Sequence, residues 1–420
     1  MKSYLPILSS ISRIIEKIIH WLKNNKKFAL VFLMILTLWV SIVAFGSKRY
    51  ADESYHYRQI RMFYSARFEM ADGLTTIPGY HAFISLPAWV IFDDLSLFKI
   101  RLLSLSTALF IIPIFFFLSK KISPPNPWEK TLILILLPIA FVYYPLIYTD
   151  IFSTLLFFLA FYLSLNQKYH WAALVSIAAI CARQQNIIWH LFIWIFTYVN
   201  LYGFNFSFKN ILNYFRATLG FIVGIILFFI FIKLNGGIAI GDKGSHPLGI
   251  YLGNIYFFLF LAGLLFWPIL LKRIFTTKKI LKNKFAWVAL GVATVVSGIL
   301  FFYPPELHGY NHDPRFIRNI FLSFIYNGHI GFYSVLVFLG ILSLFSIKLN
   351  KLSNYLIYPF TILCLLPSWL IEQRYTVIPF LLILLFRKEE YYRLENILKI
   401  YYLILCITLV FVLVELRLFL

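Results

Sequence analysis

The sequence predicts an all-α protein that crosses a membrane many times. Of its 420 residues, 61% are hydrophobic and 13% are charged, and the mean hydropathy is +0.82. Apolar runs recur from Phe28 to the C-terminus without a gap long enough for an independent water-soluble domain. Because backbone polar groups in lipid must be hydrogen-bonded internally, these runs are expected to form helices. We therefore expect a single transmembrane domain over residues 28–420.

The residues before this domain are expected to form a cytoplasmic, amphipathic N-terminus over residues 1–27. Within it, Ile7–Leu22 has the pattern of a helix that lies along the membrane surface. The first apolar run, Phe28–Gly46, is too long for the apolar core of a cleaved signal peptide. It is predicted to be the first membrane span.

A bundle of about 13 spans follows from the rule that roughly 20 apolar residues cross the hydrocarbon core. Two of the segments are short for a crossing, and we expect them to tilt or to be extended by neighbouring polar residues. After the first span, the expected spans are 102–118, 131–147, 150–166, 171–182, 187–202, 216–233, 251–271, 285–303, 330–347, 352–371, 376–386 and 397–417.

The distribution of charge predicts the orientation. A formal charge of +21 would suggest nucleic acid in a soluble protein, but here the positive-inside rule explains it and no nucleic-acid partner is expected. If Leu74–Phe92 does not cross, the inner loops carry about 24 Lys and Arg against about 5 Asp and Glu, and the outer loops about 14 against about 12. We therefore interpret Leu74–Phe92, which Pro78 and Pro87 interrupt, as a re-entrant or interfacial helix in a first external loop, residues 47–101. A crossing by this segment is the alternative.

Every aspartate and every polar cluster falls on the predicted outer side. The inner loops carry little besides lysine and are expected only to anchor the helices. The working surface is therefore predicted to be external, in the periplasm or in the lumen of an organelle. A transporter of lipid-linked glycans is an alternative to an enzyme. A transporter would be expected to show internal symmetry and charges buried in the middle of the membrane, and neither is evident.

Asp52 and Glu53 follow directly after the first span, at the rim of the membrane. Carboxylates at such a position are costly unless they are solvated or used. Neighbouring side chains do not share one face of a helix, so at most one of the two is expected to face a given pocket. We predict that they are catalytic, with Asp52 as the general base for a sugar hydroxyl and Glu53 orienting a substrate hydroxyl. The opposite assignment of the base, and an ordinary solvated loop, are the alternatives.

The segment Arg183-Gln184-Gln185-Asn186 places a permanent cation and three amides at the mouth of apolar spans, where unpaired polar groups are costly. Arg183 is predicted to bind a phosphate oxygen, and Gln184 and Asn186 to bind sugar hydroxyls. The alternative is a helix-end anchor, with Trp189 in the aromatic belt of the membrane.

A glycine-rich loop, Gly241–His246, has the composition of an anion-binding nest. Asp242, Lys243 and His246 are assigned to substrate binding, whereas the spacing does not fit a nucleotide-binding P-loop. The polar cluster His308–Arg315 does not have the spacing of a closed metal site. Neither a metal nor a cofactor is expected.

The segment Glu372-Gln373-Arg374-Tyr375 precedes a short apolar run. Arg374 either pairs with Glu372 to cap a buried helix end or neutralises a lipid phosphate. Glu372, Arg374, Tyr375 and His56 are assigned to substrate binding. Asp150 is predicted either to act as an N-cap of the helix over residues 150–166 or to have a functional role.

Together these motifs resemble the family of dolichyl-phosphate-glucose-dependent α-1,2-glucosyltransferases. In order along the chain, the family's patterns are Met-Asp-Glu-x-Phe-His, Thr-Thr-x-Pro-Gly, Arg-Gln-Thr-Asn-Ile-x-Trp, Gly-Asp-basic-x-x-His and Glu-x-Arg-Tyr. They are matched at Ala51–His56, at Thr75–Gly79, at Arg183–Trp189 with Gln185 in place of Thr, at Gly241, Asp242, Lys243 and His246, and at Glu372, Arg374 and Tyr375.

The resemblance implies a GT-C membrane fold and an inverting enzyme. Its donor would be a polyprenyl-phosphate-linked glucose, its acceptor a lipid-linked glycan, and membrane lipids its surroundings. One motif of the family is only faintly echoed, at His308–Arg315. This departure leaves the acceptor and the exact sugar open, so a related GT-C enzyme with another lipid-phosphate sugar or a bacterial acceptor is an alternative. A non-catalytic assembly factor that keeps the fold is a separate alternative.

Overall fold

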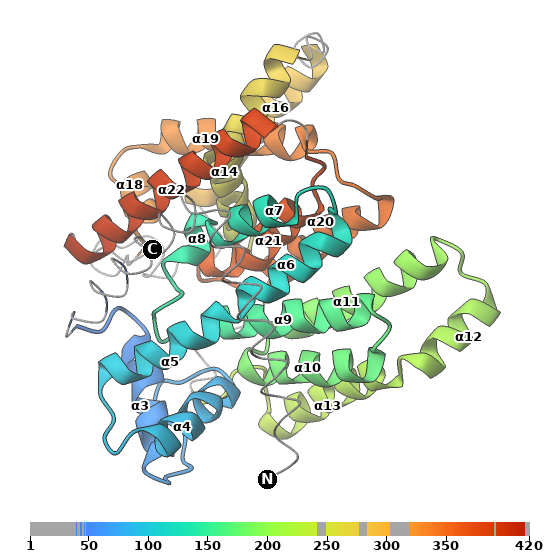
Figure 1. Ribbon diagram of the computed structural model, residues 1–420. Coiled ribbons are helices and arrows are strands. Elements are labelled where there is room, and N and C mark those ends of the chain that lie inside the picture. Colours follow the sequence, from blue (N-terminus) through green and yellow to red (C-terminus); the bar gives the residue numbers. More distant parts are fainter. Residues whose placement is uncertain are drawn as a thin grey trace. The chain divides into compact units, whose positions relative to one another are not determined.

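The computed structural model describes residues 48–241, 249–276, 284–302, 319–389 and 392–415, together with residues 39, 43 and 46. Lys48–Leu420 forms one compact unit, and the description below concerns this unit. Its described residues fold into helices and form no β-strand, which confirms the all-α prediction (Figure 1). The predicted N-terminal helix, the loop Asp242–His246 and the cluster His308–Arg315 lie outside the described residues.

The described elements are α-helices, and two short 3₁₀ segments (η2 and η3) precede α20 and α21. The elements are α3 (Glu53–Tyr64), α4 (Gly79–Ile91), α5 (Leu97–Leu109), α6 (Ile111–Ile122), α7 (Pro127–Ile135), α8 (Pro138–Phe141), α9 (Thr149–Leu165), α10 (Tyr169–Ala182), α11 (Asn186–Tyr202), α12 (Phe208–Ala217), α13 (Leu219–Asn235), α14 (Gly253–Thr276), α16 (Lys284–Phe302), α18 (Ile320–Tyr326), α19 (Ile330–Ser346), η2 (Leu352–Leu356), α20 (Ile357–Leu365), η3 (Gln373–Thr376), α21 (Val377–Phe386) and α22 (Tyr392–Glu415).

Several helices have the apolar character of membrane spans. In the described part of the chain, three stretches are long and apolar enough to cross a membrane: Leu97–Ile122, Gly253–Leu271 and Leu394–Val414. The pair α12 and α13 would be a fourth span, although it bends by 73°. The other apolar helices have 10–17 residues. These helices agree with a membrane protein, and the number of about 13 spans stays a prediction.

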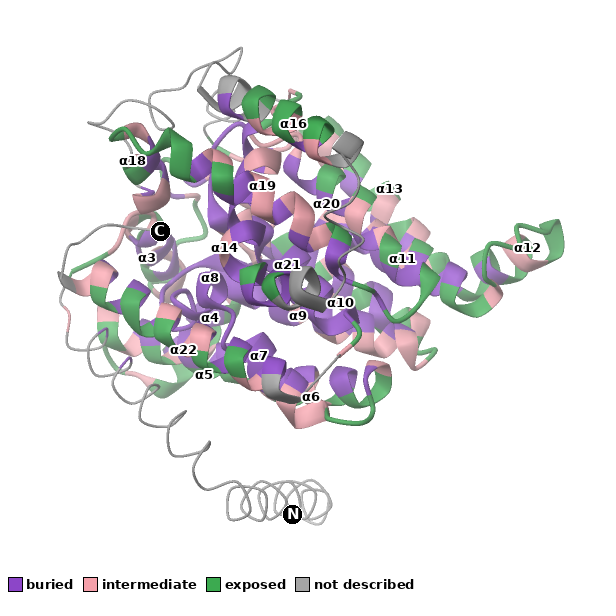
Figure 2. Cartoon of the chain, turned by 90° about the horizontal axis from the view of Figure 1, so that it is seen from above, coloured by how far each residue is buried: buried purple, intermediate pink, exposed green. Residues whose placement is uncertain are grey.

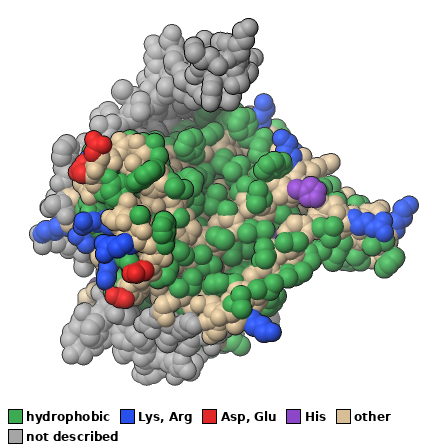
Figure 3. Space-filling model, turned by 90° about the horizontal axis from the view of Figure 1, so that it is seen from below, with side chains coloured by type: hydrophobic (Ala, Val, Ile, Leu, Met, Phe, Trp, Pro, Cys, Tyr) green, Lys and Arg blue, Asp and Glu red, His purple; other side chains and the backbone are tan. Residues whose placement is uncertain are grey.

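The outer surface agrees with this reading. Figure 3 shows a face on which hydrophobic side chains cover a broad area, with Lys, Arg, Asp and Glu gathered at its edges. Large exposed hydrophobic side chains include Trp89 and Val90 of α4, at 69% and 75% exposure. The 13 residues of α4 rise about 20 Å, less than the roughly 30 Å of a hydrocarbon core. A re-entrant or interfacial position of α4 stays a prediction.

The predicted span 131–147 is not one continuous helix. Helix α7 ends at Ile135, α8 is a four-residue helix that begins at Pro138, and turns follow up to Tyr148. Proline has no N–H to donate and clashes with the preceding helical turn, so Pro138 and Pro145 break the run. Every residue from 130 to 155 is nevertheless buried, which makes this segment part of the core.

The centre of the unit is built around α9 and α21. Helix α9 packs against α10 and α11, and Figure 2 shows buried residues along α9, α8 and α21. All ten residues of α21 are buried, although the sequence made it one of the two short spans. Helix α12 is the opposite case, because it projects from the rest and buries only Tyr214 (Figure 2).

A group of ion pairs with buried cations, which we call the anchor cluster, lies at the C-terminal end of α21. Lys130 Nζ lies 3.3 Å from Glu389 Oε1 and donates to the carbonyl of Arg387 at 3.0 Å. The sequence predicted that these loops anchor the helices mainly through lysine, and it did not predict the pairing of these cations with acids. The members of the cluster, in pairs, are Lys130 with Glu389, Arg387 with Glu395, and Lys399 with Glu129.

Candidate active site

Four chain segments meet at the N-terminal end of α21. They are the start of α3, the start of α9, the turn between α10 and α11, and η3. Just before α3, Ala51 has a φ of +43°, in the left-handed region that non-glycine residues rarely adopt. Such backbone strain persists only where the surroundings impose it, and it is common at functional sites. Ala51 immediately precedes Asp52.

Asp52 is ion-paired with Arg374, which lies 322 residues further along the chain. Arg374 Nη2 donates to Asp52 Oδ2 at 3.2 Å, while its Nε donates to Glu372. Behind this pair, the Asp52 backbone N–H donates to the Tyr148 hydroxyl oxygen at 3.0 Å, and the Arg374 guanidinium lies 5.6 Å from the centre of the Tyr148 ring. Of the two roles predicted for Arg374, pairing with Glu372 is therefore the one that the structure shows directly.

Glu53 is held by a different cation. Its carboxylate accepts from Arg101 Nε at 3.1 Å and from Arg101 Nη2 at 2.5 Å. It also accepts from the backbone N–H groups of Ile147 at 3.0 Å and Tyr50 at 2.8 Å. Both side chains are almost fully buried, at 0% and 2% exposure. Since a buried charge must be paired and hydrogen-bonded, these contacts fasten the start of α3 to α5 and to the segment before α9.

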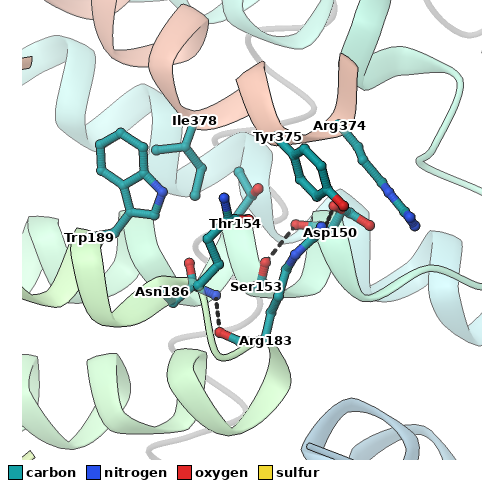
Figure 4. Close-up of a pocket in the computed structure, with 10 residues that line it drawn as sticks. Asp150, Ser153, Thr154, Arg183, Asn186, Trp189, Arg374, Tyr375 and Ile378 are labelled. Atoms are coloured by element: carbon teal, nitrogen blue, oxygen red, sulfur yellow. Dashed lines mark hydrogen bonds and ion pairs between the residues drawn. The ribbon is translucent and has the colours of Figure 1, made fainter. Parts of the chain in front are cut away.

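Arg183 forms an ion pair with Asp150 Oδ1 (Figure 4). Helix α9 begins at Thr149 and has no side-chain cap, so Asp150 is not the N-cap that the sequence predicted. Instead, it lies in the first turn and faces the Arg183 guanidinium. That guanidinium also lies 5.0 Å from the centre of the Tyr375 ring.

The amides next to Arg183 bind backbone carbonyls. Gln184 Nε2 donates to Thr75 O at 3.0 Å and Ile238 O at 3.2 Å. Asn186 Nδ2 donates to the carbonyls of Ala179 at 2.9 Å and Arg183 at 3.1 Å. Both N–H donors of each amide are thereby engaged, and Gln184 joins the loops before α4 and after α13 to this turn.

Close backbone approaches account for two glycines of the motifs. A Cβ at Gly79 would lie 2.6 Å from the carbonyl oxygen of Cys181, so only glycine lets α4 begin against the end of α10. Gly241 has a φ of +70°, and a Cβ there would lie 2.6 Å from the carbonyl oxygen of Leu74. The structure therefore places the start of the glycine loop beside the Thr-Thr-x-Pro-Gly segment.

His56 points to a second histidine. Its Nδ1 lies 2.9 Å from His81 Nε2, and the two rings stack with their centres 5.1 Å apart. Burial lowers the pKa of His56 from 6.5 to about 4, which outweighs the attraction of Asp52 for a proton there. Burial likewise holds the pKa of His81 well below its ordinary value. Both rings are neutral near pH 7, and one donates to the other.

Several residues that support the site were not found from the sequence. Arg101 is one of them, although a cation inside the apolar stretch after Phe98 is itself a signal. Asn254 is another, because its Oδ1 accepts from the Glu372 backbone N–H at 3.2 Å. Gln373, inside a motif, donates to the Tyr143 hydroxyl at 2.5 Å. Asn254 carries no sequence signal that sets it apart from other polar residues at helix starts.

The assembled side chains, which we call the site cluster, are Asp52, Asp150, Arg183, Glu372 and Arg374. Asp150, Arg183 and Arg374 line a small pocket with Ser153, Thr154, Trp189 and Tyr375 (Figure 4). Its free volume of about 20 Å³ has room for one water molecule. Among the described residues, no group of three or more His, Cys, Asp or Glu side chains is arranged to hold a metal ion. Asp242, Lys243 and His246 lie outside the described residues.

Comparison with known proteins identifies the family. Residues 46–206 and 196–385 match the DIE2/ALG10 family. A protein of Debaryomyces hansenii is 27% identical over 309 residues, which cover 64% of this chain and 65% of that protein. One of Candida albicans is 39% identical over 132 residues, 29% of each chain, and one of Kluyveromyces lactis is 22% identical over 392 residues, 79% of this chain and 72% of that protein.

All three relatives are named Dol-P-Glc:Glc(2)Man(9)GlcNAc(2)-PP-Dol alpha-1,2-glucosyltransferase. The match covers less than two thirds of the D. hansenii and C. albicans proteins. No solved structure is a significant match. The family match spans most of the chain and includes Asp52, Arg183 and Arg374, which confirms the resemblance drawn from the motifs. The chain belongs to the DIE2/ALG10 family.

Proposed function

We propose that the protein is an inverting membrane glucosyltransferase. It moves glucose from a polyprenyl (dolichyl) phosphate to a hydroxyl of a lipid-linked oligosaccharide and forms an α-1,2 linkage. Membership of the family and the names of the relatives support the reaction class. The observation that carries the proposal in this chain is that two motif cations, Arg183 and Arg374, line one pocket although they are far apart in the sequence, and that Arg374 is ion-paired with the motif acids Asp52 and Glu372.

Asp52 is assigned as the general base. Its side chain is 21% exposed, whereas those of Glu53, Asp150 and Glu372 are 0%, 3% and 12% exposed. It is therefore the most accessible carboxylate of the group, and a base must reach the hydroxyl that it deprotonates.

The reaction is a single displacement. Asp52 accepts the proton of the acceptor hydroxyl while that oxygen forms a bond to the anomeric carbon of glucose. The bond from this carbon to the phosphate oxygen breaks, and the lipid phosphate leaves with the electron pair. Attack opposite the leaving group inverts the configuration at the carbon. Cations near the departing phosphate stabilise its developing charge.

Arg183, Arg374 and Lys243 are assigned to that phosphate. The two arginines already face carboxylates, but a guanidinium has five N–H donors, so one ion pair does not exhaust it. In the described part of the site cluster, two arginines face three carboxylates. A further cation such as Lys243 is therefore needed to favour an anionic ligand.

The remaining motif residues are assigned to positioning. Glu53, through Arg101, fixes the backbone from which Asp52 projects. Gln184 and Asn186 fix the loops around the pocket through backbone carbonyls. Tyr375 packs against Arg183 at the pocket, and His56 lies beneath Asp52 as a neutral ring. Asp242 and His246 are assigned to substrate binding, as the sequence motif predicts.

The test is transfer by purified protein. It is incubated with radiolabelled polyprenyl-phosphate glucose and a lipid-linked oligosaccharide acceptor, and the product is analysed for its linkage and anomeric configuration. We expect an α-1,2-linked product from a β-configured donor. Membranes with known transferase activity serve as the positive control. If the purified protein then shows neither transfer nor donor hydrolysis, the proposal is wrong. Transfer of a different lipid-linked sugar would change the proposed donor. Labelling of cysteines introduced at positions 52 and 243 should place both on the lumenal or periplasmic side.

A further inference from the structure

One carboxylate oxygen of Asp150 is left without a hydrogen-bond partner in the described structure. Oδ1 faces Arg183. Oδ2 is buried and accepts no hydrogen bond from a described side chain or backbone group. The side chain is 3% exposed. A buried acceptor with no partner costs free energy, and a charged one costs more than a neutral one. Because Asp150 lines the pocket, a hydrogen-bond donor on a bound ligand could satisfy this oxygen.

The walls of the pocket have the character of a carbohydrate subsite. Ser153 and Thr154, one turn along α9, bring hydroxyl groups, while Trp189 and Tyr375 bring aromatic surface (Figure 4). A sugar ring offers hydroxyl groups at its edge and C–H groups on its faces, so it suits a wall of this mixed kind. The free volume of about 20 Å³ matches one hydroxyl group, not a whole ring.

We propose that Asp150 reads the donor sugar: Oδ2 accepts a hydrogen bond from one ring hydroxyl of the transferred glucose. This inference rests on the proposed function and deepens it. The hydroxyl enters the pocket and takes the place of a water molecule, while the rest of the ring lies at the pocket mouth. Asp150 is then a specificity-determining residue of the donor site, distinct from the general base.

The donor, not the acceptor, is the sugar expected here. Arg183 joins Asp150 on one side, and Arg374 lines the same pocket. In the donor, the glucose is attached directly to the phosphate that these cations are assigned to bind. A phosphate at Arg183 therefore brings its own sugar to Asp150, whereas an acceptor sugar is carried in on a separate lipid.

The experiment uses donors that each lack one hydroxyl. Polyprenyl-phosphate glucose and its 2-, 3-, 4- and 6-deoxy analogues are compared with the wild-type protein and with Asp150→Asn, which preserves the shape of the side chain. We expect one deoxy donor to lower wild-type kcat/KM by about 10- to 100-fold, as expected for a lost hydrogen bond to a charged group. Asp150→Asn should show a similar loss with glucose and little further loss with that same analogue.

Arg183→Lys is the matched control, because it alters the partner of Asp150 but retains a cation. Since every donor contains the phosphate, this variant should lower kcat/KM by a similar factor with all of them. If Asp150→Asn also lowers kcat/KM by the same factor with every donor, Asp150 has only a structural role and the inference is overturned.

The wild-type series decides the matter even if Asp150→Asn fails to fold. Equal kcat/KM values for glucose and all four deoxy donors overturn the inference, while the transferase activity itself stands. If the wild-type protein transfers no glucose at all, the proposed function falls and this inference falls with it. The two failures are therefore distinguishable.

Discussion

The two charged clusters at the ends of α21 differ in how completely their charges are paired. The anchor cluster pairs three cations with three carboxylates. The site cluster has two arginines against three carboxylates among its described members, a pocket between them, and one carboxylate oxygen without a partner. About 15 Å of fully buried helix separates the two ends. Similar residue types are thus balanced at one end, where we infer a stabilising role, and unbalanced at the other, where we propose substrate binding.

The anchor cluster also differs in its place along the chain. The family match ends at residue 385, and four members of the cluster, Arg387, Glu389, Glu395 and Lys399, follow it. They join α22 to Glu129 and Lys130 at the start of α7. We infer that the anchor cluster holds the C-terminal helix to the family core, and that its loss should affect folding more than chemistry.

The largest expected effect separates chemistry from stability at the site cluster. Asp52→Asn removes the proposed general base and should lower kcat by about 100- to 10,000-fold. Since Asp52 is partly exposed, the midpoint of thermal unfolding in detergent should change little. Full activity in Asp52→Asn would transfer the role of the base to another carboxylate.

At the anchor cluster we expect the reverse, a large loss of stability with little change in kcat. Arg387→Met leaves the Glu395 carboxylate buried without its cation and should destabilise the protein by about 3–5 kcal/mol. The double variant Arg387→Met/Glu395→Met should recover most of this loss, and kcat per folded molecule should be retained. The control is Arg58→Met, which breaks an exposed ion pair with Asp72 and should cost at most about 1 kcal/mol. Equal destabilisation in both single variants would contradict the comparison.

The Glu53–Arg101 pair is expected to behave in an intermediate way. Glu53→Gln leaves the buried Arg101 unpaired, so it should both destabilise the protein and displace Asp52. A displacement of this kind lowers kcat by roughly 10- to 100-fold. Rescue is the diagnostic measurement: adding Arg101→Gln should restore part of the activity if Glu53 only positions the loop. No rescue, with folding restored, would give Glu53 a direct part in the reaction.

The smallest expected effect is a pH dependence from His56. Its pKa is about 4 in the folded protein and 6.5 in the ordinary case, so the unfolded chain binds a proton over this range while the folded protein does not. The contribution of His56 to stability is therefore complete above pH 6.5 and is lost as the pH falls toward 4.

This dependence is measured as the thermal midpoint between pH 7.5 and pH 5. We expect the midpoint of the wild-type protein to fall on acidification, and that of His56→Gln to fall less. An identical decrease in the two proteins would assign the acid sensitivity to other groups, of which buried His81 is the first candidate.

The candidate site was predictable only in part. Asp52, Arg183 and Arg374 were recognised because charged residues next to long apolar runs stand out locally. Their partners were not, because Asp52 pairs with a residue 322 positions away and Glu53 with one 48 positions away. The helix-cap prediction for Asp150 failed for the same reason, since a distant cation outcompeted a local backbone contact.

The class of the protein follows from its sequence: the chain is helical and rich in membrane-type apolar segments, and its motif acids and cations lie outside those segments. Hydropathy and charge are summed over neighbouring residues, so a single chain contains this information. The tertiary structure alone decided which charges neutralise one another, which amides are consumed by backbone carbonyls, and that the run 131–147 is broken yet buried. These outcomes depend on distances between segments far apart in the chain, and no local pattern specifies such distances.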